Sequence, residues 1–301
     1  MPAAAADYLK LETATARFSD QPGGLVALDV RSPTATGRIF VQGAHLTEWT
    51  PAGAEPVLFC SRQSYFSPGK AIRGGVPVCF PWFAARTGYT GSPAHGFLRT
   101  AEWSVDSISD ESTGGTCVEF SARDNESTRA LWPHAFVARY TVRLADSLDL
   151  KLAIENTGDA PFTFEAALHT YLSVADVRHV TLTGLEHTEY IDKVEGGARK
   201  PQVAEPLAFT GETDRVFVNT TNTCYLHDPG LQRRISVAKS GSATTVVWNP
   251  WSAKAAGLAD FGDDEWPHML CIETANSGEN SVTLPAGETH TMTAAISVSA
   301  S

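Results

Sequence analysis

The segment Phe136–Glu155, FVARYTVRLADSLDLKLAIE, decides the fold of this 301-residue chain. Its apolar side chains recur at every second position, first in Phe136–Leu144 and then in Leu148–Ile154, while charged residues such as Arg143 and Lys151 fill positions between them. A period of two is typical of strands with one buried face and one exposed face. The segment therefore predicts half-buried antiparallel strands.

Similar short runs, separated by turn residues, extend in both directions from this segment, whereas helical periodicity is nearly absent. The best candidate helix is Pro250–Ala259, with Asn249 as its N-cap and Pro250 at its first position. Many short strands without alternating helices predict an all-β, large antiparallel sandwich. We expect one domain over residues 1–301, in which residues 1–20 form an edge strand or a tail. The further predicted strands are Leu25–Val30, Gly37–Val41, His45–Thr50, Trp103–Ile108, Thr116–Ala122, Phe162–Val174, Arg215–Asn219, Cys224–His227, Ile235–Lys239, Thr244–Trp248, His268–Thr274, Ser281–Leu284 and Thr289–Val298.

The composition limits the possible partners. The net charge of −11 argues against nucleic acid or an anionic membrane as a general partner. The five cysteines are odd in number and fit no zinc spacing, so we expect reduced core thiols. No secretory signal or membrane-spanning run is recognised, and we expect a cytoplasmic protein, most simply a monomer.

The loop-rich segment Ala71–Arg99, AIRGGVPVCFPWFAARTGYTGSPAHGFLR, stands out in this acidic chain. Its many glycines and prolines exclude a regular helix or central strand. Arg73, Arg86 and Arg99 predict an anion pocket, because guanidinium groups pair well with anions. The alternative is a solvated connection with ordinary surface arginines.

His169 and Glu273 are the candidates for acid and base chemistry. In a regular strand, each lies on the face opposite the bulky aliphatic residues of its own strand. Two such faces can present a general acid and a general base to one ligand. The parity leaves the alternative that both side chains are simply solvated.

Sequence motifs for other chemistries are missing. The chain contains no HExxH, GxSxG, Walker or GxGxxG motif. His169 and His179 have no third ligand at a useful spacing, so we expect neither a metal nor a cofactor. The Asp260-Phe261-Gly262 tripeptide is interpreted as a turn after the candidate helix.

Several motifs in this order resemble the D-hexose-6-phosphate mutarotases, also called glucose-6-phosphate 1-epimerases, of the aldose 1-epimerase superfamily. The resemblance extends from about Ile72 to Asn276. The motifs are IRGGVPVCFPWF, AHGFLR, LHTYLSV, TDRVF, WNPW, LADF and CIETAN.

The resemblance implies a galactose-mutarotase-like β-supersandwich with its site on a concave sheet face. It implies that His169 and Glu273 are the catalytic pair, acting as acid and base in the interconversion of sugar anomers. His95 and Asp214 match positions that line the sugar pocket, and Arg73 and Arg99 match positions that hold the phosphate. Arg86 is either a third phosphate contact or a solvated loop arginine, and the segment Glu189–Phe209 matches no motif.

Two other functions remain open at this point. One is an aldose 1-epimerase for unphosphorylated sugars, which would give no reason for clustered arginines. The other is a non-catalytic carbohydrate-binding β-sandwich, since fold does not fix function. The sequence does not choose among glucose, galactose and mannose 6-phosphates.

Overall fold

The alternating segment forms two long neighbouring strands in the computed structural model, which describes residues 3–86 and 88–301. Strand β8 (Phe136–Leu144) pairs antiparallel with β9 (Ser147–Asn156), with Phe136 opposite Asn156 and Leu144 opposite Leu148. The predicted apolar face is buried throughout. On the other face Arg139 binds Glu155 at 2.7 Å and Arg143 binds Asp149 at 3.0 Å.

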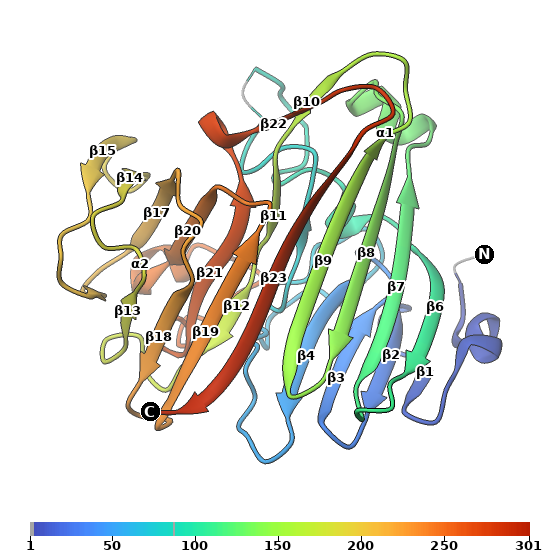
Figure 1. Cartoon of the computed structure of the whole chain (residues 1–301), viewed down its shortest axis with the longest axis horizontal. Helices are drawn as coiled ribbons and strands as arrows, with labels where there is room; N and C mark the ends of the chain where they lie inside the picture. Colours follow the sequence, from blue (N-terminus) through green and yellow to red (C-terminus); the bar gives the residue numbers. More distant parts are fainter. Residues whose placement is uncertain (1–2, 87) are drawn as a thin grey trace.

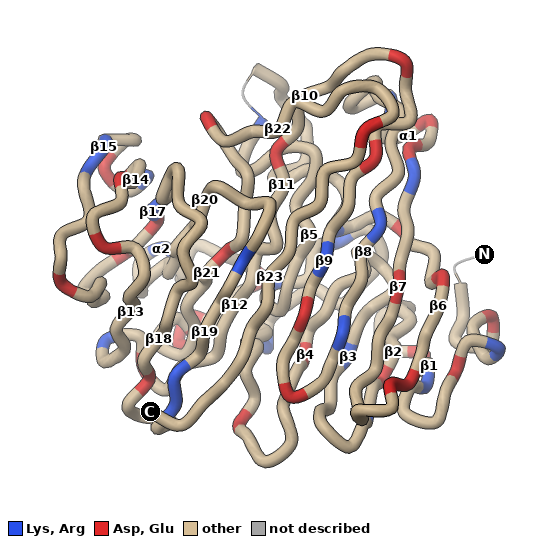
Figure 2. The backbone as a smooth tube through the Cα atoms, in the orientation of Figure 1, with Lys and Arg blue, Asp and Glu red and all other residues tan. Residues whose placement is uncertain are grey.

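These two strands lie in a nine-stranded antiparallel sheet that forms one whole layer of the molecule (Figure 1). Acidic and basic positions are interspersed along its strands in this view (Figure 2). In spatial order its remaining strands are β16 (Leu207–Ala208), β13 (Thr181–Thr183), β18 (Cys224–Asp228), β19 (Arg233–Ser240) and β23 (Thr289–Ala300) on one side, and β7 (Thr116–Arg123) and β6 (Ser104–Asp110) on the other.

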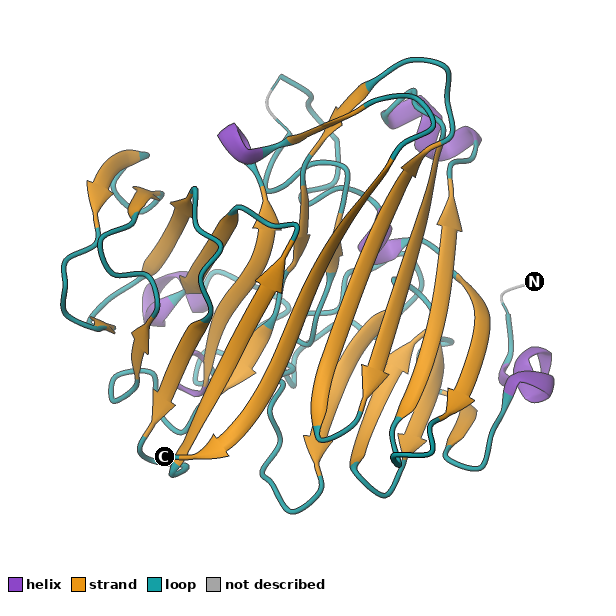
Figure 3. Ribbon diagram, in the orientation of Figure 1, coloured by secondary structure: helices purple, strands orange, loops and turns teal. Residues whose placement is uncertain are grey.

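Two sheets form the second layer behind it (Figure 3). The four-stranded sheet contains β1 (Ala16–Asp20), β2 (Val26–Arg31), β3 (Ala35–Phe40) and β4 (His45–Pro51). The eight-stranded sheet contains β15 (Ala198–Pro201), β14 (Glu189–Asp192), β17 (Thr213–Val218), β20 (Thr244–Asn249), β21 (Met269–Asn276), β11 (Ala166–Leu168) and β5 (Val78–Cys79), with β12 (Tyr171–Ser173) also paired to β21. A short ribbon joins β10 (Phe162–Phe164) and β22 (Val282–Leu284).

The core lies between the two layers. One cluster of buried apolar side chains takes members from all three large sheets, among them Leu28, Val142, Leu150, Val247 and Ile272. The predicted all-β sandwich is confirmed, and β1 is the edge strand expected within residues 1–20.

The helices are few and short. They are α1 (Glu126–Leu131), α2 (Trp251–Ala255) and the 3-10 turns Ala5–Leu11, Leu98–Thr100, Trp266–His268 and Gly278–Asn280. None of the helices in residues 3–86 and 88–301 is long and apolar enough to cross a membrane.

The prediction of a helix over Pro250–Ala259 was wrong in its extent. The predicted start was also wrong by one residue, because α2 begins at Trp251 with Pro250 as its N-cap and has no side-chain capping bond. Asn249 ends β20, and its side-chain oxygen accepts a hydrogen bond from Trp251 N at 2.9 Å, which closes a turn just before the helix. Beyond Ala255 the backbone bonds run from residue i+3 to residue i, as from Gly257 N to Lys254 O. The chain therefore continues in tight turns that carry it back toward β21.

Candidate active site

His169 lies at a break in the strand that the sequence predicted to be continuous. The run Phe162–Val174 is divided into β10, β11 and β12, and that single-strand prediction was wrong. Both β11 and β12 pair with β21, with Leu168 opposite Thr274 and Tyr171 opposite Cys271. Between them His169 N donates to Pro77 O at 3.1 Å. A residue of the loop-rich segment Ala71–Arg99 thus accepts the backbone hydrogen bond of His169 and holds this residue at the break.

Glu273 lies in the middle of β21, opposite Val246 of β20. Continuing the register of β11 and β12 places it opposite His169. Its neighbours at alternate positions, Cys271 and Ala275, share its face of the strand, as the sequence parity predicted.

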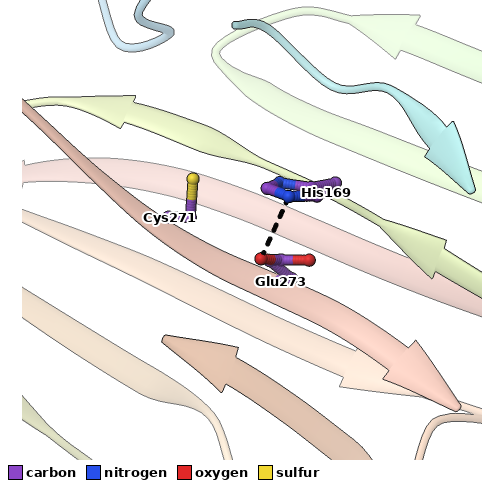
Figure 4. Close-up of side chains that lie close together, drawn as sticks. All are labelled: His169, Cys271 and Glu273. Carbon is purple, nitrogen blue, oxygen red and sulfur yellow. Dashed lines mark ion pairs between the residues drawn. The ribbon is translucent and has the colours of Figure 1, made fainter. Parts of the chain in front are cut away.

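The two side chains meet (Figure 4). His169 Nε2 is 3.4 Å from Glu273 Oε1, and the residues are only 6% and 1% exposed. This burial excludes the alternative that both are solvated. His169 Nδ1 and Glu273 Oε2 are buried without a hydrogen-bond partner in the described part of the chain. Both groups therefore retain bonding capacity for a ligand.

The burial sets the protonation of the pair. Loss of hydration raises the pKa of Glu273 well above its ordinary value, and the nearby Asp214 adds to the rise. Loss of hydration lowers the pKa of His169, and the charges of His95, Arg99 and Arg73 lower it further. Both shifts favour the uncharged forms, a carboxylic acid beside a neutral imidazole.

Packing fixes the imidazole plane. The Tyr171 ring stacks on His169, with ring centroids 4.8 Å apart and planes 10° apart. Trp248 meets the same imidazole edge-on at 6.2 Å. Both aromatic residues also contact each other, which restricts rotation of His169 about its side-chain bonds.

The pair lies in the wall of a cavity of about 640 Å³. Six of the seven residues predicted for the site line this cavity, and Arg99 is the exception. The six are Arg73, Arg86, His95, His169, Asp214 and Glu273. Its size is in the range of small-molecule sites.

His95 packs against the catalytic candidate. Its ring lies 5.4 Å from the His169 ring, and its Nδ1 accepts a hydrogen bond from Ala84 N at 3.3 Å. Burial, together with the positive charges of Arg99 and Arg73, lowers the His95 pKa to about 3. The ring is therefore neutral, with Nδ1 as acceptor and the proton on Nε2.

Backbone geometry explains the glycine after this histidine. Gly96 has φ +71°, and a Cβ at this position would lie 1.9 Å from Phe80 O. A larger residue would push apart the two strands of the loop that hold His95 in the cavity wall.

Arg73 is held by two partners inside the cavity. Its Nη2 and Nε donate to the two carboxylate oxygens of Asp260 at 3.0 and 3.3 Å, and its Nη1 donates to Tyr171 OH at 3.2 Å. Asp260 does lie in the predicted turn, but its pairing with Arg73 was not predicted. The next residue, Gly74, is tied down because its carbonyl accepts from His45 Nε2 at 2.7 Å.

The other two arginines of the loop are engaged differently. Arg99 Nη2 donates to Ala94 O at 2.8 Å, and its charge reaches the site mainly by lowering the pKa of His95 and His169. Arg86 stacks on Tyr89 at 3.6 Å and on Trp82 at 4.7 Å, and it donates to Leu131 O. Arg86 therefore borders the cavity as a packed wall residue.

Asp214 borders the opposite side of the cavity, on β17 next to Trp248. Burial raises its pKa, while Lys254, whose Nζ is 3.9 Å away, acts in the other direction. Lys193 also lines the cavity, and the sequence singled out neither lysine. Lys254 Nζ is already paired with Glu212 at 2.8 Å, so only part of its charge is available to a ligand.

Three further features of the site were missed from sequence. Glu165 accepts from Phe83 N at 2.8 Å and from Gly278 N at 2.6 Å, which ties together two segments of the cavity wall. The segment 189–209, which matched no motif, contributes two residues to the cavity lining. They are Ile191 on β14 and Lys193, which directly follows that strand. A possible metal-ligand group was also missed, because its members His169, Cys271 and Glu273 are close in space and not in sequence.

Comparison with solved structures defines the class of protein. The crystal structure of a "putative mutarotase" from Salmonella typhimurium superposes with a TM-score of 0.90 at 28% identity, covering 98% of this chain and 99% of that one. The fold is thus the galactose-mutarotase-like supersandwich that the resemblance implied.

The family follows from the sequence comparison. The model of the family described as Aldose 1-epimerase matches residues 31–297, and the chain belongs to this family of enzymes. Two curated relatives bear the name "Putative glucose-6-phosphate 1-epimerase". The one from Escherichia coli K12 is 36% identical over 83% of both chains, and the one from Cenchrus ciliaris is 33% identical over 93% of this chain and 86% of its own length.

Proposed function

We propose that this enzyme interconverts the α and β anomers of hexose 6-phosphates, with glucose 6-phosphate as the leading candidate substrate. The observation that carries the proposal is the buried His169–Glu273 pair, 3.4 Å apart, in the wall of a cavity that also contains Arg73. The names of the curated relatives support the same substrate class.

Ring opening needs two proton transfers, one at each of the two oxygens bonded to C1. The C1–O5 bond breaks with its electron pair going to O5, and the O1 hydroxyl becomes the aldehyde oxygen. Glu273 is the proposed base that takes the O1 proton, and His169 is the proposed acid that supplies a proton to O5. Because O1 and O5 are bonded to the same carbon, two groups a hydrogen-bond length apart can reach both.

The resting protonation of the pair has to change first. Burial favours neutral Glu273 beside neutral His169, so one proton moves from the carboxyl to the imidazole to give the reactive carboxylate and imidazolium. The two charges form next to each other and attract, so the exchange costs less than forming either charge alone in a dry site. After rotation about C1–C2, the ring closes with the two roles exchanged.

Arg73 is the proposed principal contact of the phosphate. It retains N–H groups beyond those given to Asp260 and Tyr171, since a guanidinium carries five. Lys193 and Lys254 line the same cavity and add to the attraction. His95 and Asp214 are proposed to contact sugar hydroxyls, while Arg99 and Arg86 act as supporting charges.

One observation favours an aldose 1-epimerase for unphosphorylated sugars as the second candidate. Asp260 already neutralises Arg73 in the free enzyme, so the cavity holds less unpaired positive charge than the sequence predicted. The non-catalytic alternative is not supported, because a buried acid and base pair in a cavity gives a binding domain no benefit.

The assay that tests the proposal measures anomer exchange on one enzyme preparation, with glucose 6-phosphate and with glucose, after subtraction of the uncatalysed rate. We expect a kcat/KM at least about tenfold higher for the phosphorylated sugar, which corresponds to one charged contact of about 1.4 kcal/mol or more. Equal kcat/KM values for the two sugars would establish an aldose 1-epimerase for unphosphorylated sugars. No rate above background with either sugar would establish a non-catalytic carbohydrate-binding domain.

We also propose that the chain works as a monomeric, single-domain cytoplasmic enzyme. The apolar cluster that joins all three large sheets supports one domain. Sedimentation of the purified protein would test the monomer.

A further inference from the structure

A third reactive side chain lies beside the His169–Glu273 pair (Figure 4). Cys271 is two residues before Glu273 on β21, so both side chains lie on the same face of the strand. Its thiol is fully buried. One ligand atom from each of His169, Cys271 and Glu273 lies within 4.8 Å of the other two. The ring-opening chemistry uses the imidazole and the carboxyl, and it leaves the thiol without a role.

The three groups are the usual zinc ligands: an imidazole nitrogen, a thiol sulfur and a carboxyl oxygen. The His169–Glu273 separation of 3.4 Å already suits two ligands of one ion. Since Zn–S and Zn–N bonds are about 2.3 and 2.1 Å, the widest pair in the group has to close by up to about 1 Å, which small side-chain rotations provide. A water from the adjoining cavity can take the fourth position.

Two members of the group also retain an unpartnered atom, on the side chains whose other atoms, Nε2 and Oε1, form the 3.4 Å contact. His169 Nδ1 and Glu273 Oε2 are fully buried, and neither has a hydrogen-bond partner among the described residues. Buried polar atoms of native proteins are nearly always satisfied, so such orphans call for an additional ligand.

We propose that His169, Cys271 and Glu273 form an inhibitory binding site for a thiophilic divalent cation, with Zn²⁺ as the type case. Binding consumes the lone pairs that the proposed proton transfers need, so the bound enzyme is inactive. The inhibition rests on the proposed function, whereas the binding itself does not.

Charge balance favours such an ion in this dry environment. A thiolate and a carboxylate are both disfavoured by burial when alone. Together with one divalent cation and a neutral imidazole they form a complex of zero net charge. Of the two guanidinium groups whose charges act on His169, those of Arg99 and Arg73, the one on Arg73 is paired with Asp260. Mg²⁺ and Ca²⁺ prefer oxygen ligands, so they do not compete for this set.

The test measures binding and activity separately on protein freed of metal with a chelator. Calorimetry without substrate follows the binding of Zn²⁺, and Co²⁺ replaces Zn²⁺ to reveal a thiolate-to-cobalt absorption band. Anomer exchange is measured over the same range of Zn²⁺. We expect one tight site per chain, a cobalt–thiolate band, and inhibition that a chelator reverses and that Mg²⁺ does not produce.

Cys271→Ser and Cys271→Ala are the diagnostic variants. Both should keep the mutarotase rate in the absence of metal, lose the cobalt band and bind Zn²⁺ at least about tenfold more weakly, because even loss of a supporting group around a metal costs 10–100-fold. The control is Cys224→Ser, a buried thiol on β18 outside the group, which should behave as the wild type.

Zn²⁺ binding and inhibition that are unchanged in both Cys271 variants would overturn the proposal. So would the absence of binding and of the cobalt band in wild-type protein. A protein that binds Zn²⁺ through Cys271 but has no mutarotase activity would uphold the binding site and contradict the proposed function.

Discussion

His169 Nε2 and Glu273 Oε1 lie 3.4 Å apart in the eight-stranded sheet, and both residues are buried in the wall of the cavity. Neither residue belongs to a motif that would connect them in sequence. Their proximity arises because β11 and β12 both pair with β21, and the break between them puts His169 opposite Glu273.

Removing either group should stop the chemistry without abolishing binding. We expect Glu273→Gln and His169→Asn each to lower turnover by about 10²–10⁴-fold, the usual range for a lost acid or base. The dissociation constant for glucose 6-phosphate, measured by calorimetry, should change little. His179→Asn, at an exposed histidine, is the matched control. Near-normal turnover in a site variant would remove that residue from the mechanism.

Glu273→Gln should also change how stability depends on pH. The folded state raises the Glu273 pKa well above its ordinary 4.5, so the wild type holds a proton that the unfolded chain releases. Stability associated with this group is complete below pH 4.5 and is lost as pH rises toward the folded pKa. The loss lowers the free energy of unfolding of the wild type by at most about 1.4 kcal/mol per pH unit, and the glutamine variant does not undergo it. In thermal unfolding from pH 4.5 to 8, the Tm of the Glu273→Gln variant should rise relative to the Tm of the wild type. A Tm difference that does not change with pH would contradict the raised pKa.

Arg73 should carry most of the phosphate contact. We expect Arg73→Ala to weaken hexose 6-phosphate binding by ~1.5–3 kcal/mol, the range for hydrogen bonds to charged groups. Arg73→Lys keeps the charge but loses the fork, so it should weaken binding as well. Arg99→Ala should have a smaller effect, because its side chain does not line the cavity.

The specificity of these effects is checked with glucose and with a remote arginine. Neither site variant should change the kcat/KM for unphosphorylated glucose appreciably. Arg129→Ala, which breaks a surface pair with Asp124, should bind the sugar phosphate as the wild type does. If Arg73→Ala also did so, the phosphate would have to bind elsewhere.

Tyr171 should contribute through the orientation of Arg73. Tyr171→Phe removes the hydroxyl that accepts from Arg73 Nη1 and keeps the ring that stacks on His169. We expect KM for glucose 6-phosphate to rise by a factor equivalent to about 0.5–1.5 kcal/mol, with kcat nearly unchanged. Tyr140→Phe is the control, since its buried hydroxyl has no partner among the described residues. A fall in kcat with constant KM would point to a role in proton transfer instead.

Chelation should not inactivate the enzyme. Ring opening as proposed moves two protons and no electrons, and the residues supply both transfers. Activity should therefore persist after exhaustive EDTA treatment and dialysis, and it should rise if the preparation carried inhibitory zinc. Activity lost on chelation and restored by added metal would show that the reaction needs an ion.

The long strands were predictable from sequence because each buries one face. One buried face requires an apolar residue at every second position, and this alternation is visible in the sequence. Phe136–Leu144 was predicted to the residue. The short strands β13, β14, β15 and β16 were missed, because with two to four residues they are too short to show a period. The helix predicted over Pro250–Ala259 begins one residue later and ends four residues earlier, because cap and propensity signals locate a helix only approximately and tertiary packing decides its ends.

At the site, the sequence indicated the residues and missed their partners. Parity placed Glu273 on the correct face, but only the register of three strands could show that His169 is its neighbour. Asp260 was interpreted as a turn residue because nothing in its local sequence refers to Arg73, which lies far away in the chain. Pairing across such separations depends on tertiary structure, which no local pattern records.

The Arg73–Asp260 pair has a consequence for which anions the enzyme admits. Asp260 is a tethered carboxylate, so it competes for the guanidinium at an effective concentration of roughly millimolar or above. A small monovalent anion such as chloride or bicarbonate offers Arg73 less than this internal competitor does, so we expect it to bind only weakly. A phosphate dianion that brings a sugar ring into the cavity gains contacts along its whole length and can share or displace Asp260. The Asp260 carboxylate thus favours ligands that combine a phosphate dianion with a sugar ring over small inorganic anions.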